Sequence, residues 1–241
     1  EYKEKKEILK KLENNKIDII FGTHAIFQKK VIFNKLGLII IDEQHKFGVN
    51  QRKKLSDKGG VDCDVLLMTA TPIPRTLTMT IYGDMDISII REKPKNRKPI
   101  KTYSKLEEKI DDVLKFVDKQ IKLGNQIFWV CPLIEESKKL DHSSAVMKFE
   151  YLKKKFPNQV CLLHGKTDIE EKNKILNNFL KNKFKILVST TIIEVGIDFP
   201  NANVIVIENA NKFGLSQLHQ LRGRVGRGNN DSTCIVMFKS N

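Results

Sequence analysis

Short apolar runs alternate with amphipathic segments along the whole chain. Leu38 to Ile41 is a typical run, and polar residues follow it directly. One amphipathic segment spaces its apolar residues so that they share one face of a helix. These residues are Ile110, Val113, Leu114, Val117 and Ile121. Buried parallel strands connected by helices produce this alternation, so the sequence predicts an α/β fold with parallel sheets.

The bounds of the expected elements follow from where each run and each amphipathic segment begins and ends. We expect strands at residues 18–21, 36–41, 65–68, 126–131, 159–163, 185–189, 204–207 and 234–238. We expect helices at residues 4–12, 110–121, 144–155 and 168–180. A further short helix is expected after Pro74, because proline suits the first turn of a helix.

A polar, charged stretch separates this alternation into two halves. Residues 91–99 contain two prolines and otherwise only charged or polar side chains, which is typical of a linker. We therefore expect a first domain at residues 1–92, a linker at residues 93–101 and a second domain at residues 102–241. Each half is long enough to bury a core of its own.

The composition is that of a globular protein with an excess of cations. The formal net charge is +14, which favours a polyanionic partner such as nucleic acid. A compositional bias of AT-rich codons, which enriches Lys together with the uncharged Asn and Ile, would also explain the excess, and that alternative stays open. No apolar run approaches the roughly 18 residues of a membrane-spanning helix. The cysteines form no C-x-x-C pair, so we interpret them as buried thiols and not as zinc ligands: Cys63, Cys131, Cys161 and Cys234.

Two acidic residues directly follow the apolar run that ends at Ile41. Chemistry in parallel sheets gathers at the carboxyl ends of the strands. There Asp42 can hold Mg²⁺ through water, and Glu43 can orient or deprotonate an attacking water. Alone, the pair is better explained as polar residues that end a strand. Its neighbours on the chain, and Thr69-Ala70-Thr71 after the next apolar run, favour a nucleotide site.

The segment from Gln220 to Gly228 carries the most specific pattern in the chain. Arg224 and Arg227 are three residues apart and would project from one face of a helical turn. The glycines among them let the backbone approach a partner closely. Guanidinium groups that reach a transferring γ-phosphate stabilise the charge of the transition state. A basic patch for nucleic acid is the alternative interpretation.

Two further segments carry residues suited to phosphate. Ser189-Thr190-Thr191 follows a predicted strand, and its hydroxyls can hold backbone phosphates of a nucleic acid. Downstream, Asp198 meets either a ribose hydroxyl or one of the arginines. Gly22-Thr23-His24 is a weaker candidate for a phosphate contact.

One tripeptide resembles a phosphate-binding loop without being one. Gly165-Lys166-Thr167 matches the end of G-x-x-x-x-G-K-[ST], but Val160 stands where the first glycine is required. Asp168 is instead expected to cap the next helix. The chain contains no complete loop of this kind and starts without Met. We therefore expect a fragment that turns over negligible ATP by itself.

These segments resemble the motifs of superfamily-two helicases, and among them those of the RecG family. Asp42-Glu43-Gln44-His45 resembles the second helicase motif, and Thr69-Ala70-Thr71 resembles the third. Ser189 to Asp198 resembles the fifth motif, and Gln220 to Arg227 the sixth. Further stretches similar to the RecG family are residues 42–49, 68–76, 82–86, 97–100 and 130–137.

The resemblance implies two RecA-like lobes with ATP and Mg²⁺ between them, the first lobe lacking its N-terminal part with the phosphate-binding loop. It implies ATP-driven translocation on duplex DNA by a cytoplasmic monomer that remodels stalled forks, Holliday junctions and other branched intermediates. The implied catalytic residues are Glu43, Asp42, Arg224, Arg227 and Gln220. The implied nucleotide contacts are Asp42, Glu43, Arg224 and Arg227 together with Gly196 and Asp198. Asp42 is implied to hold the metal through water. The residues implied to couple ATP hydrolysis to closure of the lobes are Gln44, His45, Thr69 and Thr71. The residues implied to contact DNA are Thr23, His24, Thr190 and Thr191.

Two other interpretations stay open. The related translocase Mfd, which acts on stalled RNA polymerase, shares much of the first-lobe pattern. Gln44 in place of a second glutamate, and Val130 to Ser137, favour RecG over Mfd. The other interpretation is a DNA-binding module that hydrolyses nothing.

Overall fold

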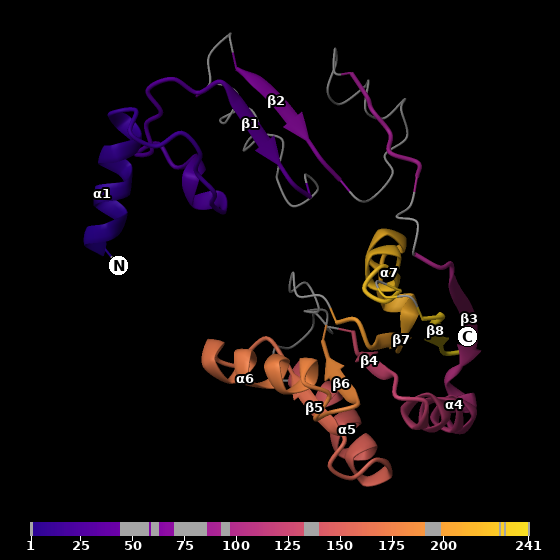
Figure 1. Cartoon of the computed structure of the whole chain (residues 1–241). Coiled ribbons are helices and arrows are strands. Elements are labelled where there is room, and N and C mark those ends of the chain that lie inside the picture. The colour runs from indigo at the N-terminus through magenta and orange to yellow at the C-terminus, as the bar shows by residue number, and fades with distance from the viewer. Residues whose placement is uncertain are drawn as a thin grey trace. The chain divides into compact units, whose positions relative to one another are not determined.

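The computed structural model describes residues 2–43, 58, 63–69, 86–92, 97–132, 140–190, 199–226, 228 and 230–240. The chain divides into two compact units, residues 1–85 and 86–241 (Figure 1). This boundary lies before the one expected at residue 92. The first strand of the second unit, β3 (Ile100–Leu106), also begins inside the expected linker at 93–101.

The first unit contains one helix and two parallel strands among its described residues. They are α1 (Tyr2–Glu13), β1 (Leu38–Ile41) and β2 (Asp64–Leu67), together with the short 3-10 helix η1 (His24–Phe27). All three longer elements confirm expected segments. In β1, Ile39 and Ile41 are buried, whereas Leu38 and Ile40 are more than half exposed. The strands therefore have one packed face and one open face.

One expected strand of this unit is wrong. Residues 18–21 have no regular structure, and Ile19 and Phe21 are 73% and 91% exposed. A strand needs a neighbour for its backbone N–H and C=O groups. No described strand pairs with this segment. The helix expected after Pro74 lies outside the described residues.

The second unit is built on a six-stranded parallel sheet, which confirms the predicted α/β class. Its strand order is β3-β8-β7-β4-β6-β5. The other strands are β4 (Gln126–Val130), β5 (Val160–Leu163), β6 (Ile186–Ser189), β7 (Ala202–Ile207) and β8 (Ser232–Phe238). The helices are α4 (Ile110–Lys122), α5 (Leu140–Lys155), α6 (Ile169–Leu180) and α7 (Leu215–Arg222), with the 3-10 helices η3 (Glu107–Lys109) and η4 (Ala210–Lys212).

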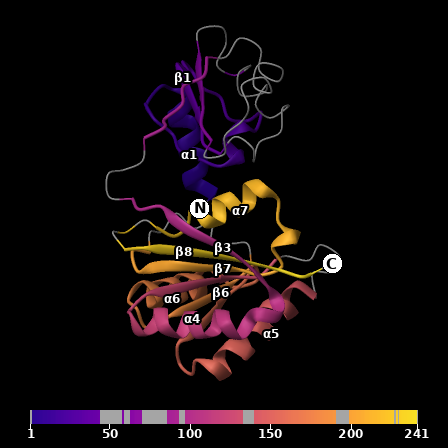
Figure 2. The same ribbon diagram turned by 90° about the vertical axis from the view of Figure 1, so that its right-hand side faces the viewer.

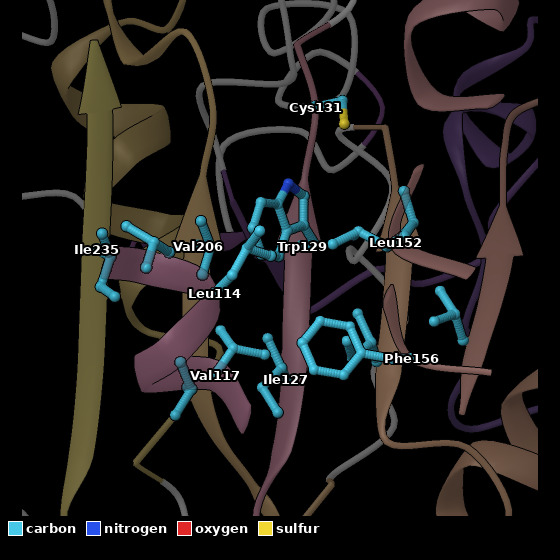
Figure 3. Close-up of a cluster of buried hydrophobic side chains, with 14 of the residues drawn as sticks. Leu114, Val117, Ile127, Trp129, Cys131, Leu152, Phe156, Val206 and Ile235 are labelled. Carbon is cyan, nitrogen blue, oxygen red and sulfur yellow. The ribbon is translucent and has the colours of Figure 1, made fainter. Parts of the chain in front are cut away.

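Helices cover both faces of this sheet. Figure 2 shows α4 and α5 on one side and α7 on the other. On the first side, Ile127 and Trp129 of β4 pack against Leu114 of α4 and Leu152 of α5 (Figure 3). On the other side, Phe128 packs against residues of α6 and α7. Because β4, β6 and β7 are buried on both faces, they appear in the sequence as continuous apolar runs.

The sequence did not predict β3 or α7. β3 is largely exposed, and its sequence IKTYSKL has no apolar run. α7 has eight residues and buries only Leu221 fully. Both elements are held by neighbours that a local pattern does not reveal. β3 pairs along its full length with β8, from Ile100 opposite Ser232 to Leu106 opposite Phe238.

All four cysteines are free thiols; Cys131, Cys161 and Cys234 are buried as expected, whereas Cys63 is only partly buried. Burial raises the pKa of Cys161 to about 12 and that of Cys234 to about 11, so both remain protonated. Within the part of the chain that the structure describes, no helix combines the length and the apolar character needed to cross a bilayer.

Candidate nucleotide and nucleic-acid site

The acidic pair and the third-motif threonine lie at the same edge of the first unit. β1 and β2 run in register, with Ile41 opposite Leu67. Beyond them the pairing continues, because Met68 N donates a 2.8 Å hydrogen bond to the carbonyl oxygen of Ile41. Asp42, Glu43 and Thr69 therefore follow the two strands side by side, at the carboxyl end where α/β folds place their chemistry.

A local hydrogen bond fixes the turn that carries the acids. Glu43 has φ of 51°, a left-handed conformation that is uncommon for a residue with a side chain. Its N–H donates to Oδ1 of Asp42 over 2.9 Å. Strained backbone of this kind clusters at functional sites. Asp42 thus supports the unusual backbone of the residue next to it.

The chemistry of this pair suits Mg²⁺ held beside a nucleotide. Mg²⁺ takes oxygen ligands, keeps several of its waters, and is held by one or two carboxylates together with phosphates. Asp42 is exposed and Glu43 is half-buried, so the pair combines an accessible carboxylate with a partly shielded one. Asp42 would hold the metal, and the shielded Glu43 would act on water.

The fifth-motif hydroxyls lie inside the second unit, at the carboxyl end of β6. Ser189 and Thr190 are 0% and 2% exposed, and within the described part of the chain neither hydroxyl oxygen has a hydrogen-bond partner. Buried hydroxyls without partners are rare because each loses its hydrogen bonds to water. Thr190 is therefore placed at the expected edge, but its hydroxyl is covered by the protein.

The first-unit candidate for nucleic acid is more accessible. Thr23 is exposed and directly precedes η1, where Ile26 N donates to its carbonyl oxygen over 3.1 Å. A side chain at Gly22 would meet the Ile26 methyl group at 2.5 Å, so glycine keeps this turn tight. His24 is the first residue of η1.

The arginine segment, residues 223–231, departs from the expected helical turn. α7 carries Gln220 but ends at Arg222, with Gly223 as its C-cap. Arg224 lies beyond the helix, and Gly226 follows with φ of +77°. A left-handed residue interrupts a right-handed helix, and residues 224–226 are not helical. The helical turn expected at Arg224 is therefore wrong, whereas Arg227 lies outside the described residues.

The glycines of the arginine segment do permit close approach, and the partner they approach is the protein itself. A Cβ at Gly228 would lie 2.9 Å from the carbonyl oxygen of Pro200. A Cβ at Gly226 would lie 3.0 Å from Ile100 Cγ1, in a backbone conformation already unfavourable for other residues. The path of the segment therefore requires glycine at both positions.

A buried ion pair near the same sheet edge was missed by the sequence analysis. Lys148 Nζ of α5 lies 2.6 Å from Glu208 Oε1, just after β7, and the two side chains are 19% and 11% exposed. The Cys131 thiol lies 3.7 Å from Glu208 Oε2, and burial together with this carboxylate raises the pKa of Cys131. Lys148 also lies over the rings of Trp129 and Tyr151. An acid directly after an apolar run, as at Asp42, was the available signal.

The tripeptide that resembles a phosphate-binding loop forms a closed turn. Lys166 N donates to His164 Nδ1 over 3.2 Å, and His164 N donates to the Thr167 hydroxyl over the same distance. Asp168 caps α6 by accepting a 2.8 Å hydrogen bond from Glu171 N, as predicted.

Several predicted site residues lie outside the described residues. They are Gln44, His45, Thr71, Thr191, Gly196, Asp198 and Arg227.

Two family profiles match the chain. "DEAD/DEAH box helicase" matches residues 1–80, and "Helicase conserved C-terminal domain" matches residues 108–229, just over half of the chain. ATP-dependent DNA helicase RecG of Bacillus subtilis strain 168 is 52% identical over 237 residues, which are 98% of this chain and 35% of that protein. RecG of Thermotoga maritima is 50% identical over 236 residues, or 97% and 30% of the two chains.

Solved structures of helicases also match the chain. The structure of RecG bound to a three-way DNA junction matches with a TM-score of 0.71 and 44% identity, over 99% of this chain and 31% of that one. Dbp5 of S. cerevisiae bound to RNA and ADP BeF3 matches with a TM-score of 0.62 over 90% and 57% of the chains; its 18% identity supports the fold alone.

The chain thus spans about a third of the length of the curated relatives that it matches. Its two units correspond to the two helicase profiles, and the similarity to RecG extends over nearly all of it. The chain therefore belongs to the helicases that carry the conserved C-terminal domain, and it is homologous to RecG.

Proposed function

We propose that the protein is an ATP-dependent DNA translocase of the RecG kind, which remodels stalled forks, Holliday junctions and other branched duplexes. The observation that carries this proposal is the identity of about 50% to RecG over 97–98% of the chain. RecG is named an ATP-dependent DNA helicase in those relatives, and its solved structure is bound to a DNA junction. We further infer a cytoplasmic monomer.

In the proposed reaction, the first unit supplies the acids and the second supplies the cations. Asp42 holds Mg²⁺ through water while Glu43 orients the water that attacks the γ-phosphate of ATP. Arg224 and Arg227 reach the phosphates from the second unit and stabilise the charge of the transition state. The side-by-side placement of Asp42, Glu43 and Thr69 supports the first half of this scheme.

The remaining candidate residues would contact the nucleotide, couple hydrolysis to closure of the units, or contact DNA. Gln220, Gly196 and Asp198 complete the nucleotide contacts, and Gln44, His45, Thr69 and Thr71 couple hydrolysis to closure of the units. Thr23, His24, Thr190 and Thr191 contact the DNA backbone. Because Thr190 is 2% exposed, it can contact the DNA backbone only if the chain around it opens. The net charge of +14 supports a polyanionic partner.

The test is Arg227→Ala in the protein as its full reading frame encodes it. We expect DNA-stimulated ATP hydrolysis to slow about 10³-fold or more, the usual scale for an arginine that reaches the transferring phosphate. DNA affinity should change far less. Arg91→Ala, which removes an exposed cation of the same unit, should leave hydrolysis at the wild-type rate.

Loss of DNA affinity with intact hydrolysis would instead place Arg227 on the DNA. Binding to a duplex should weaken steeply with salt, because phosphate contacts release counterions. A salt-independent affinity would contradict a motor that tracks the DNA backbone. The 241-residue chain alone contains no G-x-x-x-x-G-K-[ST], and we expect it to hydrolyse ATP only at background.

A further inference from the structure

Residues 97–101, just before and at the start of β3, contact the arginine segment. Arg97 Nη2 donates a 3.1 Å hydrogen bond to the carbonyl oxygen of Gly223, the C-cap of α7. The last carbonyls of a helix have no partner within the helix, and they carry the negative end of its dipole. A guanidinium group suits this position, because its charge is permanent and its N–H groups form a rigid fork.

The same short stretch contacts the arginine segment at two more points. Ile100 packs so closely on Gly226 that a Cβ there would lie 3.0 Å from Ile100 Cγ1. At the far end, Asp231 pairs with Lys98 at 2.9 Å and Lys101 at 3.5 Å. Residues 97–101 therefore contact the arginine segment at its start, its middle and its end.

The three contacts differ in what they do. The lysine pairs are more than half exposed, and ion pairs of that kind contribute little. Ile100 packs against a core cluster and fixes one point of the path. Arg97 holds the point where α7 ends and the chain turns into the stretch that carries Arg224. That turn sets the path of the chain from α7 into Arg224.

We propose that Arg97 is a positioning residue for the arginine segment, which carries the cations proposed to act on ATP. This inference rests on the proposed function. Arg97 acts through the segment and does not itself contact the nucleotide.

Two measurements on the protein from the full reading frame test this role. In Arg97→Ala, hydrogen–deuterium exchange at residues 223–231 should be faster, with exchange in β4 and β7 unchanged. The kcat of DNA-stimulated ATP hydrolysis should fall between about 10-fold and 100-fold, the scale of a small misplacement of a catalytic group. KM for ATP and the affinity for DNA should stay near their wild-type values.

Matched variants separate positioning from loss of charge. Arg97→Lys keeps a cation and a donor, and should recover part of kcat and of the exchange protection. Arg91→Ala removes a nearby exposed cation and should change neither. Faster exchange with wild-type kcat would overturn the proposal, as would unchanged exchange at residues 223–231. A wild-type protein without ATP hydrolysis would refute the proposed function, while the exchange result would still report whether Arg97 holds the segment.

Discussion

The two units place their candidate residues at the same kind of edge but hold them in different ways. In the second unit, every residue of β4, β6 and β7 is buried, and helices pack on both faces. In β1 and β2 of the first unit, buried or half-buried residues alternate with exposed ones. The outward face, which includes Leu38, Ile40 and Leu66, is about half exposed.

This difference determines what fixes each part of the site. Glu43 is held by a hydrogen bond to its own neighbour, Asp42, and by the register of two short strands. The arginine segment is held by contacts from Arg97, Ile100 and Pro200, which are distant in sequence. Substitutions in the core should therefore reach the second half of the site and have little effect on the first.

The largest effect is expected from Phe179→Ala in the core of the second unit. Phe179 is fully buried, and its ring lies 5.7 Å from Phe128 and 5.4 Å from Phe199 between centroids. The cavity should cost about 3–5 kcal/mol of unfolding free energy. Urea unfolding followed by fluorescence of Trp129, the one tryptophan, measures it. The neighbouring Leu180→Ala, at 42% exposure, is the control; equal losses in both variants would contradict a tightly packed face.

A smaller effect is expected from Glu208→Gln. The change leaves the Lys148 ammonium without its carboxylate in a site that is mostly shielded from water. We expect a loss of about 2 kcal/mol or more. Asp118→Asn breaks the exposed ion pair with Lys122 and should cost less than about 1 kcal/mol. If both losses were alike, the buried pair would have no special part in joining α5 to the end of β7.

The smallest effect distinguishes the two faces of β1. Ile39→Thr places a hydroxyl on the packed face and should cost about 1–3 kcal/mol locally. Ile40→Thr changes the open face and should stay within about 0.5 kcal/mol. Hydrogen exchange of the Met68 amide, which is bonded to Ile41, reports the local stability. Equal exchange in the two variants would mean that β1 is packed on both faces or on neither.

Much of the fold was predictable because its central strands are buried on both sides. Apolar runs such as 126–131 and 185–189 predict these strands even when their neighbours in the sheet are unknown. β3 escaped prediction because its stability comes from pairing with β8, more than a hundred residues away. The false strand at 18–21 is the converse case, an apolar run without a partner.

The site was predictable where its geometry is local. Asp42 and Glu43 follow their strand, and Asp168 caps its helix, as the short patterns indicate. The helical turn expected for Arg224 was wrong, because α7 ends at Arg222 and Gly226, packed against Ile100, adopts a left-handed conformation. The Lys148–Glu208 pair joins two elements sixty residues apart, and no spacing rule predicts such a contact.

The most direct test of a motor that uses the Asp42–Glu43 edge is the rate of DNA-stimulated ATP hydrolysis by Glu43→Gln, in the protein from the full reading frame. Loss of the carboxylate removes the group that activates water, so we expect the rate to fall about 10²-fold or more, with DNA binding retained. Glu13→Gln, at the exposed end of α1, should hydrolyse ATP as the wild type does. A Glu43→Gln protein that hydrolyses ATP at the wild-type rate would contradict the proposed role of this edge.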